Sequence, residues 1–86
     1  MSISNNIDLD NLLKNIREKL IFYRNRSKKS VYQLGLDSGV DNSVIFRIEK
    51  GERAPHLTTL LKMLSALDVT PNEFFGEFDQ IILLGK

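Results

Sequence analysis

The sequence predicts an all-α fold of five helices. Apolar residues recur at intervals of three and four, and capping residues separate the segments that show this period. No segment alternates apolar and polar residues as a half-buried strand does, although the run 81–84 fits either a strand or a helix. With 86 residues, of which 42% are hydrophobic and 27% charged, residues 1–86 are expected to form one domain.

The first expected helix carries apolar residues on one face. Asp8 or Asp10 is placed to cap its start, and the pattern ends near Arg26, which makes this helix longer than the others. The apolar positions are Leu9, Leu13, Ile16, Leu20 and Tyr23.

The second helix is expected over residues 31–38. Ser30 can cap it, and Gln33 lies three residues later, where a capping box places a side chain that returns a hydrogen bond. Gly39 follows, and glycine takes the left-handed conformation that closes a helix without steric cost. A sharp turn is therefore predicted after residue 38.

The third helix is expected over residues 42–50, between Asp41 as its cap and Gly51. Ile45 and Ile48 are its inward positions. A fourth helix is expected over about 57–67, with an apolar stripe of Leu57, Leu60, Leu61, Leu64 and Leu67. Thr70-Pro71-Asn72-Glu73 is a capping box with proline at the first helical position and predicts a fifth helix that contains Phe74 and Phe75.

The second and third helices have the features of a helix-turn-helix. This motif needs a short turn, a small residue where the helices touch, and apolar residues behind the second of them. Gly35 is the small residue, and the apolar set is Leu34, Val40, Ile45 and Ile48. The positions left facing outward are Asn42, Ser43, Val44, Phe46 and Arg47.

Charge is unevenly distributed along the chain. Residues 14–29 hold seven basic side chains and one acidic one, whereas the rest of the chain holds five basic and ten acidic ones, for a net charge of +1. This predicts a basic face and an acidic back. Phosphate contacts are expected from Arg26, Lys28 and Lys29.

Composition argues against several other classes of protein. There is no cysteine and one histidine, so disulfides and a structural zinc site are not expected. We expect no membrane segment, no signal peptide and a cytoplasmic location. The sequence shows no nucleophile beside a base, no paired carboxylates and no glycine-rich phosphate loop. An enzyme, a cofactor and a small-molecule ligand are therefore not expected.

The segment GVDNSVIFRIEKGERAP resembles the Cro/C1-type (XRE) helix-turn-helix family. The resemblance covers a core of about residues 20–75, because LIFYR, SVYQLGLDSGV and LLKMLSALDVTPNEFF agree with it in spacing. It implies a five-helix, lambda-repressor-like DNA-binding domain that reads the major groove with its third helix. Here that domain has an N-terminally extended first helix and a short apolar C-terminal tail.

The resemblance also assigns roles to residues. It implies a structural ion pair between Arg24 and Glu49, and phosphate contacts near Ser30, Val31, Asn42 and Arg53. For base reading, Arg47 can pair with a guanine edge, Asn42 or Ser43 can hydrogen-bond a base, and Val44 or Phe46 can touch a thymine methyl. Arg47 pairing with nearby acids, and Phe46 packing against protein, are the alternatives.

The chain departs from the family pattern at two places before and within the motif. Val31 stands where the family usually has glutamine, and Lys28 and Lys29 stand where it usually has glycine and an apolar residue. We interpret Lys28 and Lys29 as positions where the packing usual in the family is replaced by positive charge.

The expected function is a sequence-specific transcriptional regulator, most simply a dimeric repressor on a palindromic operator. Phe74, Phe75, Phe78 and the apolar run 81–84 either close the core or form an interface, and residues 76–86 are a possible dimerisation tail. An antitoxin, or an adaptor whose main partner is a protein such as a toxin, is the alternative.

Overall fold

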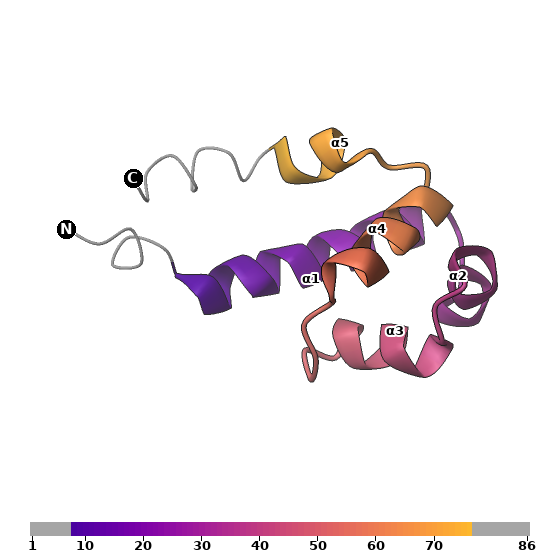
Figure 1. Cartoon of the computed structure of the whole chain (residues 1–86), viewed down its shortest axis with the longest axis horizontal. Coiled ribbons are helices and arrows are strands. Elements are labelled where there is room, and N and C mark those ends of the chain that lie inside the picture. Colours follow the sequence, from indigo (N-terminus) through magenta and orange to yellow (C-terminus); the bar gives the residue numbers. More distant parts are fainter. Residues whose placement is uncertain (1–7, 77–86) are drawn as a thin grey trace.

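The structure, a computed structural model, describes residues 8–76, and these residues contain five helices and no strand. The helices are α1 (Leu9–Arg26), α2 (Val31–Ser38), α3 (Asn42–Glu49), α4 (Leu57–Ala66) and α5 (Pro71–Phe75). The predicted all-α fold is confirmed. In Figure 1, α2 lies at one end of α1, and α3 and α5 lie on opposite sides of it. The N-terminal half of α1 extends past α4, as expected of a lengthened first helix.

The helix starts follow the predicted caps. Asp8 Oδ1 accepts a hydrogen bond from the Asn11 amide at 3.0 Å, which identifies Asp8 as the cap of α1. Ser30 and Thr70 accept hydrogen bonds of 3.0 Å from the amides three residues later, at the starts of α2 and α5. Each bond satisfies an amide that has no partner inside its helix.

Gln33 does not take the predicted place in a capping box. Its side-chain amide donates to Asp37 Oδ1 at 2.9 Å, one turn further along α2. The side chain thus points along the helix, where residues four apart are neighbours.

Three helices end in the same pattern of backbone hydrogen bonds. After α1, α3 and α4, the residue two places beyond the helix has a positive φ: Lys28 (57°), Gly51 (80°) and Asp68 (57°). At α1, the Lys29 amide donates to the Arg24 carbonyl and the Lys28 amide to the Asn25 carbonyl. These are the two hydrogen bonds of a Schellman motif. Only one of the three left-handed positions is glycine, the residue that fits them without a steric penalty.

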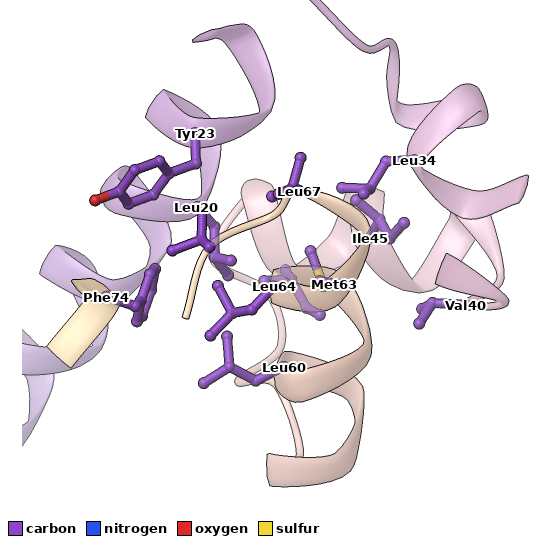
Figure 2. Close-up of a cluster of buried hydrophobic side chains, with 12 residues drawn as sticks. Leu20, Tyr23, Leu34, Val40, Ile45, Leu60, Met63, Leu64, Leu67 and Phe74 are labelled. Carbon is purple, nitrogen blue, oxygen red and sulfur yellow. The ribbon is translucent and has the colours of Figure 1, made fainter. Parts of the chain in front are cut away.

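The core gathers one side chain or more from every helix (Figure 2). Tyr23 and Phe74 lie on one side of Leu64, and Leu34 and Ile45 lie beyond Met63. The aromatic rings of Tyr23 and Phe74 have centroids 6.1 Å apart, which joins α5 to α1. The buried hydrophobic residues are Leu20, Tyr23, Leu34, Val40, Ile45, Ile48, Leu60, Met63, Leu64, Leu67, Val69 and Phe74.

The apolar stripe predicted for α4 is partly wrong. Leu57 is 67% exposed and Leu61 39% exposed, whereas Met63 is fully buried. The buried positions of this helix, Leu60, Met63 and Leu64, centre the inward face on the side away from Leu61. Six of its ten residues are apolar, more than one face of so short a helix can hold, so periodicity alone left the direction of that face ambiguous.

Within residues 8–76, no helix combines the length and the apolar composition needed to cross a bilayer. The same residues hold no group of three or more His, Cys, Asp or Glu side chains placed to bind a metal ion. The predicted tail residue Phe78 and the run 81–84 lie outside the described residues.

Candidate nucleic-acid interface

The turn between α2 and α3 sets the position of the third helix. Gly39 has φ of 75° and caps α2 through its amide, which donates to the Gly35 carbonyl. A Cβ atom on Gly35 would lie 3.0 Å from the Val40 carbonyl oxygen and 3.4 Å from Asn42 Cβ. The absence of a side chain at residue 35 therefore lets the start of α3 approach α2 closely.

An ion pair holds the other end of α3. Arg24 Nε donates to Glu49 Oε2 at 2.6 Å, and Arg24 Nη2 donates to Glu49 Oε1 at 2.8 Å. The remaining Arg24 nitrogen, Nη1, donates to the Lys29 carbonyl at 2.9 Å. The hydrogen bonds and charge of Glu49 raise the pKa of Arg24 despite its partial burial. One guanidinium thus joins α1, α3 and the loop before α2, with the fork geometry that arginine makes with carboxylates.

Between these two ends, α3 buries Ile45 and Ile48 and exposes a polar face. Of the expected base-reading residues, Asn42, Ser43, Phe46 and Arg47 are exposed. Val44 is only partly exposed and packs against the core. Val44 was expected to face outward, but it lies at the edge of the exposed face.

Hydrogen bonds to Asp41 organise the start of α3. Asp41 Oδ1 accepts from the Ser43 amide and from the Ser43 hydroxyl, both at 2.8 Å. These bonds, with the nearby charge of Arg47, lower the pKa of the exposed Asp41 carboxyl. The Ser43 hydroxyl proton is used within the protein, so the Ser43 oxygen is left to act as a hydrogen-bond acceptor.

Phe46 and Arg47 project from the middle of α3. Phe46 is 52% exposed, and the Lys50 ammonium lies 5.4 Å from its ring centroid, a cation–π distance. Arg47 forms no ion pair with an acid of residues 8–76. Its guanidinium is therefore available to a partner outside the protein.

Lys29, expected to bind phosphate, makes two contacts inside the protein. Its Nζ donates to the Ala66 carbonyl at 2.7 Å and forms a 2.8 Å ion pair with Asp37. Ala66 is the last residue of α4, where carbonyls lack helical partners and the helix dipole attracts a cation. These contacts favour a structural role for Lys29, joining α2 to the end of α4.

The other basic residues near α2 are more accessible. Lys28 is exposed in the loop. The Arg26 guanidinium is half-exposed, stacks 4.5 Å from the Tyr23 ring centroid and lies 3.8 Å from Glu73. Ser30 is exposed at the start of α2, and Val31 packs partly against the core with its amide in the first turn.

At the C-terminal end of α3, Arg53 lines a small pocket together with Arg17 of α1. Sequence reasoning included Arg53 among the phosphate contacts but left Arg17 out. Arg17 is 34 positions before Gly51 in the chain, so no local pattern places the two side by side.

The family comparison agrees with this geometry. A family model described as helix-turn-helix matches residues 20–74, from the middle of α1 to α5. Comparison with curated proteins and with solved structures gave no match.

Proposed function

Because this chain belongs to the Cro/C1-type (XRE) helix-turn-helix family of DNA-binding transcription regulators, we propose that it is a dimeric repressor of a palindromic operator. In this proposal α3 enters the major groove, and Asn42, Ser43, Phe46 and Arg47 meet base edges. Val44 reaches the DNA only from the edge of that face.

The single observation that carries the proposal is the outward face of α3. That face offers a guanidinium that forms no ion pair with an acid of residues 8–76, an amide, and an exposed aromatic ring. Arginine pairs bidentately with guanine, asparagine with adenine, and an apolar surface with the thymine methyl. The backbone behind the face is held at both ends by the Gly35 contact and the Arg24–Glu49 pair, so these groups are presented on a rigid element.

Phosphate contacts flank this face in the proposal. Arg26, Lys28 and Arg53 supply charge, and the first turn of α2, with Ser30 and Val31, supplies backbone amides at a helix N-terminus. Lys29 contributes through the fold, by holding α2 against α4.

Dimerisation is supported by apolar surface on α1. Leu9 is 61% exposed and Phe22 58% exposed, and both lie on the longest helix. In this proposal the partner domain covers these two exposed apolar side chains of α1. A symmetric pair of domains would place two recognition helices about one helical turn apart on DNA.

The test of base reading is the Arg47→Ala variant, assayed against the preferred operator and against mixed-sequence DNA. We expect it to lose about 1–3 kcal/mol of discrimination, or roughly 5- to 150-fold, at guanine positions. Lys62→Ala, which removes one exposed charge from α4, is the matched control and should retain discrimination. Operator discrimination that survives Arg47→Ala unchanged would rule out readout through Arg47.

A second candidate function, an adaptor or antitoxin that mainly binds protein, is favoured by one observation. Tyr32 and Leu36 of α2 are 63% and 62% exposed and line an open groove of about 490 Å³ beside Gly39 and Val40. An adaptor would bind DNA weakly and without sequence preference, whereas a repressor would keep its operator preference after Leu36→Glu.

A further inference from the structure

We infer that Arg17 of α1 joins Arg53 in a pocket that binds a backbone phosphate of DNA, at the end of α3 far from α2. This inference rests on the proposed function and extends the contact surface to α1. The helix-turn-helix itself does not include this helix.

Both arginines line one small pocket of about 70 Å³, whose other walls are Leu13, Ile48, Gly51, Ala54 and Pro55. Most of its lining residues come from the end of α3 and the loop before α4, a segment that can be followed in Figure 1. Arg17 and Arg53 are both partly exposed, so solvent reaches both side chains.

The absence of a side chain on Gly51 leaves room for the Arg17 guanidinium. A Cβ atom on Gly51 would lie 2.7 Å from Arg17 Nη1 and 3.2 Å from Arg17 Cζ. The guanidinium therefore lies directly against the backbone of the loop. Because Gly51 has φ of 80°, the same residue closes α3 and leaves room for the arginine.

Among residues 8–76, no carboxylate forms an ion pair with Arg17 or Arg53. Glu49, the acid at the end of α3, is bound by Arg24. The C-terminal carbonyls of α3 supply only a partial negative charge. Two arginines that line one pocket, with no ion-pair partner among residues 8–76, suit an anion with several acceptor oxygens, which is what a phosphate diester offers.

The position of the pocket selects DNA as the source of that phosphate. Arg47 lies on α3, and the pocket is lined by residues from the end of α3 and the loop that follows it. The Glu52 amide donates to the Arg47 carbonyl, so this loop stays close to the last turn of the helix. When α3 occupies the major groove, the end of the helix and its loop approach the phosphates that border the groove. Arg17 then meets the backbone beside the bases that α3 reads.

The test measures DNA binding as a function of salt for the wild type, Arg17→Gln, Arg17→Lys and the control Lys14→Gln. Lys14 is an exposed cation on the same helix and does not line the pocket. The probe is a duplex of mixed sequence about three helical turns long, and circular dichroism melting checks that each variant is folded.

We expect Arg17→Gln to reduce the salt slope by about 0.9 for each bound monomer. The affinity loss relative to wild type is then roughly three- to fourfold greater at about 50 mM than at about 200 mM salt. Arg17→Lys should keep the wild-type slope because it keeps the charge, and Lys14→Gln should change the slope much less.

An Arg17→Gln variant with an unchanged slope would overturn the inference while the proposed function stands, whether or not its melting temperature falls. An equal loss of slope for Lys14→Gln would also overturn it, because the effect would then be general charge. If the wild type itself binds DNA without salt dependence, the proposed function fails as well.

Discussion

At the scale of single residues, Lys28 has an unfavourable backbone conformation. It occupies the left-handed position of the Schellman motif that ends α1, with φ of 57°, whereas the equivalent position after α3 is Gly51. A side chain with a Cβ atom is disfavoured there by about 1–2 kcal/mol. The family usually has glycine at this position, so the exposed charge of Lys28 is present at a cost in stability.

Replacing Lys28 by glycine should therefore raise the free energy of unfolding by about 1 kcal/mol, after allowance for the greater freedom of glycine in the unfolded chain. Urea denaturation monitored by circular dichroism measures it. Lys28→Ala removes the same charge but keeps the Cβ atom, and it should show no such gain. Equal stability of the two variants would contradict the backbone explanation.

Two exposed aspartates link stability to acid pH. Hydrogen bonds from Lys29 and Gln33 lower the pKa of Asp37, and hydrogen bonds from Ser43 lower the pKa of Asp41. A carboxyl whose pKa is lower in the folded state stabilises the fold above its unfolded pKa. That contribution is lost as the pH falls through the folded pKa.

The free energy of unfolding should thus fall as the pH is lowered below about 4, the ordinary aspartate pKa. Urea midpoints measured between neutral and acid pH test this expectation. Asp37→Asn with Asp41→Asn should flatten the acid limb, because asparagine still caps α3 but does not titrate. An acid limb of wild-type steepness in the double variant would assign the effect to other groups.

At the scale of helices, α4 lacks the cap that α1, α2, α3 and α5 have. His56 stands at its N-cap position with an extended backbone, but its side chain makes no capping hydrogen bond. Asp8, Ser30, Asp41 and Thr70 cap the other helices with side-chain oxygens.

The His56→Ser substitution should stabilise the protein by about 1 kcal/mol, because serine can accept a hydrogen bond from the amide of Thr59. Thermal melting measures the gain. His56→Ala should leave the melting temperature close to the wild-type value, since no cap is removed. A loss of stability in the alanine variant would show that the histidine side chain supports α4 in another way.

The helices and their ends are predictable from the sequence because their causes are local. Ser30, Gly39 and Thr70 act on amides and turns within a few residues, and the structure confirms the helices they delimit. The inward face of α4 was only partly predictable, because periodicity does not choose among positions in a helix with six apolar residues of ten. Met63 was missed for this reason.

The site is less predictable than the fold because its contacts join distant parts of the chain. Lys29 reaches the carbonyl of Ala66, and Arg17 lies against Gly51. Basic residues in a sequence indicate charge, but only the packing of the helices shows which ammonium groups are bound inside the protein. The contact between Arg24 and Glu49 was expected only because the family resemblance supplied it.

At the scale of the whole molecule, the fold presents one exposed face of α3 together with basic groups in the loops before α2 and after α3. The described chain is elongated, with extents of 44 × 24 × 19 Å, and α1 is its longest element. Arg17 and Arg53 line a pocket at the C-terminal end of α3, and Lys28 lies in the loop before α2, which Arg24 joins to Glu49. Such a surface combines groups that bind phosphates with groups that distinguish bases.

Selection of bound sequences from a random pool of duplex DNA tests the central claim most directly. The account predicts an enriched inverted repeat whose half-sites are centred about 10 base pairs, or 34 Å, apart. Each half-site should contain a guanine that the Arg47→Ala variant no longer selects. A pool that shows no enriched sequence after selection, or an enriched guanine that Arg47→Ala selects as strongly as wild type, would contradict base reading by this face of α3.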